Sequence, residues 1–188
     1  MKYETELVKL GTFDISGKMR VSDPCYRPET WCSGVLDTRP GRWEAAVLVL
    51  DSSTTGGWGD RVAVIAVKHE YCELPLSTDT INKSLHNMYL CGWKIADFEV
   101  GVDSGQAGFY DEDKFVARNG GDDDDWYDMV CDITLSEQSA GVFDDGAVSS
   151  SGYGDGGYSC VYHTDTNNKV DFAYIVFIMN EENEEGDC

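Results

Sequence analysis

The stretch Trp43-Glu44-Ala45-Ala46-Val47-Leu48-Val49-Leu50 decides the fold class, because it reads as a strand that is apolar on both faces. Successive side chains of a strand point to opposite faces of the sheet, and both alternating sets here consist largely of alanine, valine and leucine. A strand that is buried on both sides belongs in the interior of a sheet. The sequence therefore predicts a sheet with residues 43–50 among its inner strands.

Apolar runs of the same kind recur along the chain and are separated by turns rich in glycine, serine and aspartate. They predict further strands at residues 6–10, 17–22, 61–69, 93–100, 141–150, 159–163 and 170–179, with Ile95 among the core residues. Helical spacing of apolar residues predicts a helix over 77–90 and a shorter one near 126–133. Hairpins and loops link most neighbours, so we expect a single mainly β (α+β) domain over residues 1–180. This domain has a largely antiparallel sheet or sandwich of about eight or nine strands with one or two short helices.

Two segments are expected to lie outside this regular pattern. Residues 25–41 follow Pro24 and contain Pro28 and Pro40, so we expect an irregular loop that Trp31 and Leu36 hold against the core. Residues 181–188 are mostly acidic and predict a disordered tail.

The net charge of -21, from 35 acidic and 14 basic residues, restricts the partners of this protein. Nucleic-acid polymers and anionic membranes both require a basic face, so we expect neither. A cation, a basic protein or plain solubility all agree with this charge. No apolar run reaches the roughly 18 residues that span a bilayer.

The cysteines point to a reducing compartment. Their number, seven, is odd, and no two are spaced as Cys-x-x-Cys. The polar N-terminus does not resemble a signal peptide. We therefore expect free thiols in the cytoplasm.

Glycine-rich loops are the most unusual feature of the sequence. Residues 149–158 read Ser-Ser-Ser-Gly-Tyr-Gly-Asp-Gly-Gly-Tyr, and residues 101–108 form a second loop of the same kind. Glycine permits positive φ angles and lets another group approach the backbone closely. The two loops are either plain structural turns or the walls of a binding pocket.

Four segments carry a resemblance to a known family. They are Val21-Ser22-Asp23-Pro24-Cys25-Tyr26, Trp126-Tyr127-Asp128, the loop at 101–109 and the loop at 148–158. Together they resemble the uncharacterised family of bacterial and phage proteins that is catalogued as domain of unknown function 4241. The resemblance covers roughly residues 17–178 and implies a cytoplasmic protein of bacterial or phage origin. It implies no particular chemistry.

If the fold brings the two glycine loops together, they form a pocket of backbone N–H groups, hydroxyls, carboxylates and tyrosine rings. Such a pocket suits a small polar ligand, with nucleotide-like molecules among the candidates. A phosphate would depend on backbone N–H groups helped by Arg20, Arg27 or Arg61. The residues expected to line the pocket are Asp23, Tyr26, Asp103, Ser104, Gln106, Ser151, Tyr153, Asp155 and Tyr158.

Catalytic and metal-binding patterns are weaker. Ser151 with His163, or a pair of aspartates, are the candidates for a hydrolase, although no Gly-x-Ser-x-Gly turn is present. The pairs His69 with Cys72 and His86 with Cys91 have zinc-like residue types, but ordinary buried cysteines explain them as well. We therefore expect no metal and no cofactor.

The favoured function is non-enzymatic binding of a small polar ligand by the two glycine loops. In a phage protein, such binding would sequester a host signalling molecule. Two alternatives remain open, namely a small hydrolase that uses Ser151 or paired aspartates with His163, and an acidic decoy that binds a basic protein.

Overall fold

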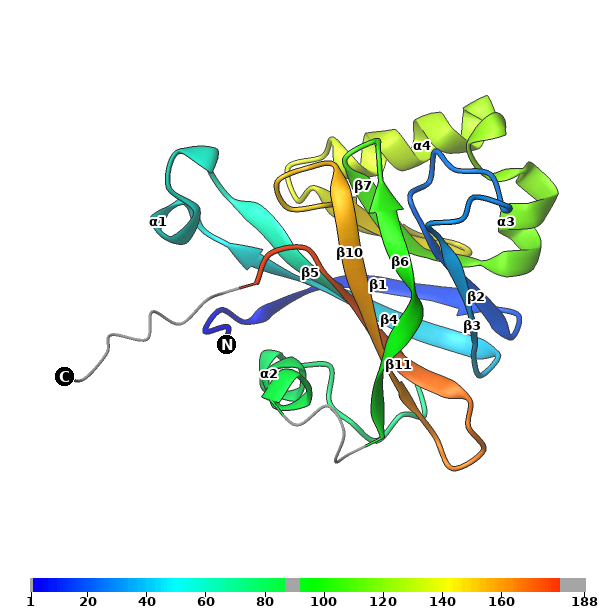
Figure 1. Cartoon of the computed structure of the whole chain (residues 1–188), viewed down its shortest axis with the longest axis horizontal. Coiled ribbons are helices and arrows are strands. Elements are labelled where there is room, and N and C mark those ends of the chain that lie inside the picture. The colour runs from blue at the N-terminus through cyan, green and yellow to red at the C-terminus, as the bar shows by residue number, and fades with distance from the viewer. Residues whose placement is uncertain (1, 87–91, 180–188) are drawn as a thin grey trace.

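The computed structural model of the chain describes residues 2–86 and 92–179 (Figure 1). Within these residues the protein is mainly β, with eleven strands in two antiparallel sheets and four α-helices. The predicted fold class is confirmed, with more strands and helices than expected. Cys91 and the tail at 181–188 lie outside the described residues.

The larger sheet has six strands. Strands β4 (Gly41–Leu50) and β5 (Arg61–His69) lie inside this sheet, and their central residues Val47, Leu48, Val64 and Ile65 are fully buried. The interior position predicted for residues 43–50 is therefore confirmed. The strands in spatial order are β1 (Leu7–Ile15), β4 (Gly41–Leu50), β5 (Arg61–His69), β11 (Val170–Val176), β10 (Gly156–Thr164) and β6 (Trp93–Val102).

The smaller sheet has five strands and is covered by helices. Its spatial order is β3 (Gly34–Asp37), β2 (Lys18–Ser22), β7 (Gln106–Asp111), β9 (Gly146–Ser150) and β8 (Ala140–Phe143). The helices α3 (Glu112–Arg118) and α4 (Asp124–Thr134) lie beside this sheet in Figure 1. They bury a separate aromatic cluster of Tyr110, Phe115 and Trp126, which holds both helices to the strands.

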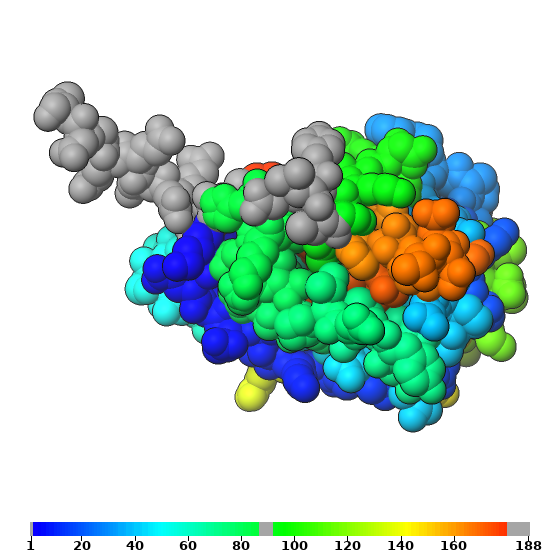
Figure 2. All heavy atoms as spheres, turned by 90° about the horizontal axis from the view of Figure 1, so that it is seen from below, coloured from blue at the N-terminus to red at the C-terminus, as the bar shows by residue number. Residues whose placement is uncertain are grey.

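The remaining helices lie in the connections between strands of the larger sheet. They are α1 (Ser52–Thr55), a 3-10 turn at Gly56–Trp58 and α2 (Thr78–His86). A second 3-10 turn, Gly120–Asp122, joins α3 to α4. Figure 2 shows α2 next to the N-terminal segment. Asn82 in α2 accepts from the N–H of Tyr3 and donates to its carbonyl, both at 2.8 Å. The Tyr3 hydroxyl donates to the Ile178 carbonyl at 2.7 Å, so one side chain ties the start of the chain to its last described residues.

Several local predictions are corrected by the structure. Residues 25–41 are not wholly irregular, since β3 forms there and buries Leu36, whereas Trp31 is 82% exposed and is not part of the core. Ile95 is half-exposed because β6 is the edge strand of the larger sheet. Residues 141–150 form two strands, β8 and β9, rather than one. The described residues contain no helix with the length and apolarity needed to cross a membrane.

Candidate ligand-binding site

The two glycine loops meet in space. The Ser151 N–H donates to the Gly105 carbonyl at 3.0 Å, and Gln106 pairs with Ser150 across β7 and β9. On the other side, Gly157 pairs with Gly101 across β10 and β6. Both loops therefore lie at the same end of the molecule (Figure 1).

Asp23 fastens a third segment to this junction. Its carboxylate is fully buried and accepts four hydrogen bonds. The donors are the N–H of Cys25 at 2.8 Å, the N–H groups of Asp103 and Ser104 at 2.8 Å each, and the Ser104 hydroxyl at 2.6 Å. The loop after β2 is thereby held against the turn between β6 and β7.

Close backbone packing completes the arrangement. Gly101 donates its N–H to the Cys32 carbonyl at 2.8 Å, and a Cβ at Gly101 would lie 2.4 Å from the Cys32 sulfur. A side chain at this position would push the 25–33 loop away from β6. Here glycine is required by the approach of the second segment.

A cavity of about 530 Å³ opens between these three segments. Three exposed carboxylates, those of Glu99, Asp103 and Asp155, stand around it. No lysine, arginine or histidine is among its described lining residues, which also include Tyr26, Thr30, Trp31, Cys32, Gly101, Val102 and Gly156. The site is therefore acidic.

Two aromatic side chains line the acidic cavity. Trp31 is the most exposed tryptophan among the described residues, at 82%, and the half-buried ring of Tyr26 lies on the same loop. Burial raises the pKa of the Tyr26 phenol well above its usual range, and hydrogen bonds with Cys32 and Asp103 raise it further. The phenol is thus neutral at physiological pH and adds no charge to the three carboxylates.

Of the residues expected at the pocket, the structure places Tyr26, Asp103 and Asp155 at the cavity and directs the others elsewhere. The Ser104 hydroxyl donates a hydrogen bond to the Asp23 carboxylate. The side-chain oxygen of Gln106 accepts a hydrogen bond from the Thr134 hydroxyl of α4 at 2.6 Å. The Ser151 hydroxyl donates to the Gly154 carbonyl at 2.9 Å. These polar groups shape the loops and do not line the cavity.

The two tyrosines of the second glycine loop also lie outside the cavity. The Tyr158 hydroxyl donates to the Gly154 carbonyl at 2.6 Å, and its ring packs on Phe177. Tyr153 is exposed and its ring meets that of Trp58, with centroids 5.6 Å apart. Tyr158 therefore stabilises the loop, and Tyr153 links it to the turn before β5.

The lining residues that sequence reasoning missed are mainly Trp31, Thr30 and Glu99. Trp31 was expected in the core because a tryptophan in a proline-containing loop usually anchors it. Glu99 lies on β6 and is exposed because that strand is at the sheet edge. Which strand forms an edge is decided by pairing between distant segments.

The candidate catalytic pair does not come together. Ser151 precedes β10, whereas His163 lies near its far end, so about 20 Å of extended strand separates them. His163 instead contacts Asp171, with Nδ1 and Oδ1 2.7 Å apart. Asp23 is unsuited to an aspartate pair, because its fully buried carboxylate is already engaged by four donors, whereas Asp103 and Asp155 both line the acidic cavity.

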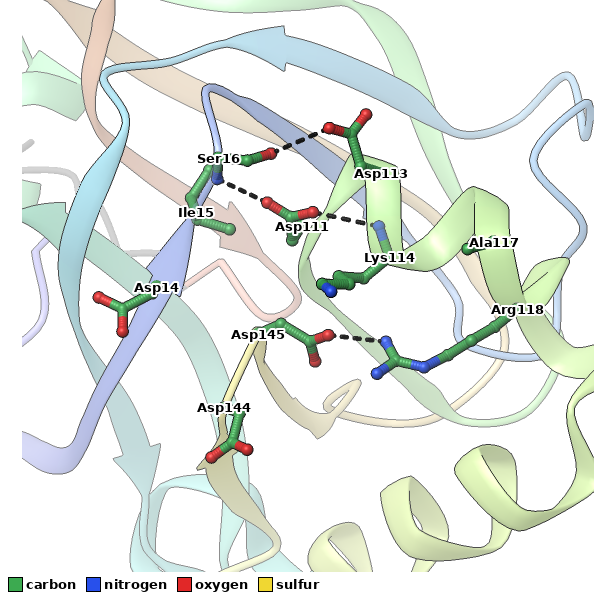
Figure 3. A pocket seen from close by; sticks show the side chains of 10 residues that line it. All are labelled: Asp14, Ile15, Ser16, Asp111, Asp113, Lys114, Ala117, Arg118, Asp144 and Asp145. Carbon is green, nitrogen blue, oxygen red and sulfur yellow. Dashed lines mark hydrogen bonds and ion pairs between the residues drawn. The ribbon is translucent and has the colours of Figure 1, made fainter.

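A larger hollow of about 760 Å³ lies between the turn after β1 and α3 (Figure 3). Two of its carboxylates, those of Asp111 and Asp145, have structural partners. Asp111 accepts from the N–H of Ser16 at 2.6 Å and from the N–H of Lys114 at 3.1 Å, and Asp145 pairs with Arg118 at 2.8 Å. This hollow is therefore a weaker candidate for a binding site than the cavity at the glycine loops.

No family model matches this chain, and comparison with curated proteins and with solved structures gave no match. The resemblance to domain of unknown function 4241 accordingly stays a prediction, and function has to be argued from the site.

Proposed function

We propose that this protein binds a small organic cation, one that carries amine or guanidinium groups, in the cavity beside the glycine loops. The observation that carries this proposal is the lining itself, with three carboxylates and two aromatic rings and no basic side chain among the described residues. Ammonium and guanidinium groups are attracted both by carboxylates and by the faces of aromatic rings. The proposal keeps the predicted small polar ligand and makes it positively charged.

The remaining charges of the protein favour the same ligand class. A net charge of -21 concentrates cations around the molecule and speeds their encounter with it. A nucleotide phosphate would be repelled by the three carboxylates, and no basic side chain among the described lining residues would compensate for this repulsion. Arg20, one of the arginines expected to help a phosphate, is buried and bound at 2.6 Å to Glu112, and Arg27 pairs with Asp122 at 3.0 Å.

A thermal-shift and calorimetry screen tests this proposal. The panel contains spermidine, agmatine, arginine methyl ester and a lysine-rich peptide, with cyclic nucleotides, sugars and Mg²⁺ as comparisons. A ligand at a hundredfold excess over its Kd stabilises the native state by about 2.7 kcal/mol. We expect such a shift with at least one small amine or guanidine and none with the nucleotides.

Variants locate the binding. Trp31→Ala and Asp103→Asn are expected to weaken binding at least about tenfold, because each removes one contact of the cation. Tyr71→Ala and Asp132→Asn are the matched controls, since they remove an exposed aromatic ring and an exposed carboxylate that do not line the cavity. Equal losses in the controls would contradict the proposal.

The screen also separates the alternatives. Binding of only the lysine-rich peptide, lost at high salt and unchanged in the variants, would favour the acidic decoy, because exposed charges are screened over about 10 Å at 0.1 M salt. Consumption of a bound ligand would favour an enzyme.

A further inference from the structure

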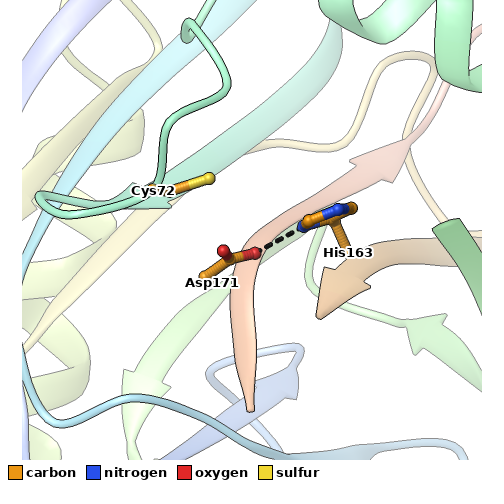
Figure 4. Close-up of side chains that lie close together, drawn as sticks. All are labelled: Cys72, His163 and Asp171. Carbon is orange, nitrogen blue, oxygen red and sulfur yellow. Dashed lines mark hydrogen bonds and ion pairs between the residues drawn. The ribbon is translucent and has the colours of Figure 1, made fainter. Parts of the chain in front are cut away.

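A second cluster of polar side chains lies at the other end of β10, away from the acidic cavity. Cys72, His163 and Asp171 come from three separate segments and converge there (Figure 4). The potential ligand atoms of these three residues all lie within 4.8 Å of one another. Cys72 and Asp171 are only 6% and 5% exposed, so the cluster is set into the protein and is not a chance surface group.

A β-bulge directs Asp171 toward His163. The pairing of β10 with β11 steps from His163↔Phe172 to Thr164↔Val170, which leaves Asp171 as an extra residue without an opposite partner. Bulges bend a strand and re-aim a side chain, and they are frequent next to functional sites. Here the bulge places the Asp171 carboxylate 2.7 Å from Nδ1 of His163.

A tight turn after β5 presents Cys72 to the same pair. The Cys72 N–H donates to the His69 carbonyl at 2.9 Å, which closes the turn. The nearby imidazole of His69 is not available as a ligand. Its Nδ1 accepts from the Tyr71 N–H at 3.2 Å, and its Nε2 lies 3.1 Å from the Pro40 carbonyl. Cys72 therefore faces a different histidine from the one suggested by the His69-x-x-Cys72 spacing.

The cluster forms part of the wall of a cavity of about 450 Å³. Glu73 and Asp165 contribute further carboxylates to this wall, and Arg39 pairs with Asp165 at 3.6 Å. Figure 2 looks toward this face, where the green segment after β5 lies beside the orange turn between β10 and β11. The side of the cluster toward the cavity leaves room for water or another small molecule.

We propose that Cys72, His163 and Asp171 form a zinc site that has three protein ligands and a fourth position open to this cavity. Thiolate, imidazole and carboxylate are the three ligand types that zinc accepts in proteins. In a tetrahedral zinc site neighbouring ligand atoms lie about 3.3 to 3.6 Å apart, as follows from the usual bond lengths. The His163–Asp171 separation of 2.7 Å is shorter than this range, and all the separations lie within 4.8 Å, so small side-chain rotations would complete the site.

The charges and the coordination number agree with zinc. One thiolate and one carboxylate balance the two positive charges of the ion, and the imidazole binds in its neutral form. Three protein ligands with an open position characterise zinc sites that bind water or a substrate, whereas structural sites have four protein ligands. The ion would hold the turn after β5 to the β10–β11 hairpin and present a bound water to the cavity.

The test is titration of the full chain, freed of metal with a chelator, with Zn²⁺ in the presence of a chromophoric competitor. We expect one equivalent of zinc per chain, and Cys72→Ser and His163→Gln are each expected to weaken affinity at least about a hundredfold. Cys131→Ser and His86→Gln are the matched controls and should retain wild-type affinity. His86→Gln also tests the spacing-based alternative of His86 with Cys91.

Two measurements on the wild-type protein keep the proposal testable if a variant fails to fold. Co²⁺ should produce a thiolate-to-cobalt absorption and the visible bands of a tetrahedral ion. Zinc should shift the NMR signals of the His163 ring and leave those of His69 and His86 in place. Three results would overturn the zinc site. They are a lack of saturable one-to-one binding, unchanged affinity in folded Cys72→Ser or His163→Gln, and a cobalt spectrum without the thiolate band. Each would leave His163 and Asp171 as an ordinary ion pair.

Discussion

Replacement of Asp23 by asparagine is expected to lower the free energy of unfolding by about 3 kcal/mol or more. The carboxylate is fully buried and accepts hydrogen bonds from Cys25, Asp103 and Ser104. Asparagine keeps the shape but turns an NH₂ group toward backbone N–H donors, so at least one donor loses its partner inside the protein. Urea unfolding of the two proteins measures the difference directly.

The same substitution is expected to abolish binding in the acidic cavity, since the Asp23 carboxylate holds Asp103 and the Tyr26 loop in place. Asp155→Asn is the matched control, because it makes the same chemical change at an exposed position of the cavity. It should weaken ligand binding without changing stability. A loss below about 1 kcal/mol for Asp23→Asn would show that the junction is held by its backbone contacts alone.

Gly120→Ala is expected to cost about 3 kcal/mol or more, which makes it the second large effect. A Cβ at this position would lie 1.9 Å from the Tyr26 carbonyl oxygen and 3.0 Å from the Phe115 ring, and the glycine has a φ of +59°. The backbone of the Tyr26 loop would have to move. Thermal unfolding reports the loss of stability, and the affinity for the cation reports the displacement of Tyr26.

Gly59→Ala separates the clash from the backbone strain. Gly59 has a φ of +70°, and a Cβ there would meet nothing within 4 Å. Its ψ of -168° places it in a region populated almost only by glycine, so its substitution should cost backbone strain of about 1 to 3 kcal/mol and should leave binding unchanged. If the two alanine variants lose equal stability, close packing of the Gly120 turn on the Tyr26 loop does not matter.

The strands were the most predictable part of the fold. Residues 61–69 are apolar on both faces and form a strand with these bounds, because full burial on both faces leaves a continuous apolar signal. α3 escaped prediction because it is short and buries only Phe115, so it has no apolar stripe. The division into two sheets is set by pairings such as β2 with β7, which the local pattern does not contain.

The lining of the acidic cavity was only partly predictable, for a similar reason. Of the residues that the glycine loops and their neighbours suggested, Tyr26, Asp103 and Asp155 lie around one cavity. A polar side chain in such a loop can hydrogen-bond either to a ligand or to the protein itself. Gln106 and Ser151 form their hydrogen bonds within the protein. The distinction depends on which hydrogen-bond partner lies in reach, and that partner belongs to a distant segment of the chain.

The place of β11 has a consequence for how the protein is made. It is the last strand of the described chain, yet it lies inside the larger sheet between β5 and β10. While the ribosome synthesises the chain, β1, β4 and β5 emerge before β11. Until β11 is made, one edge of β5 has no strand to pair with. That edge carries an almost continuous apolar run, the kind of surface at which nascent chains aggregate. Among the described strands, translation of β11 is therefore the event that closes the larger sheet, and we expect the edge of β5 to be prone to aggregation until then.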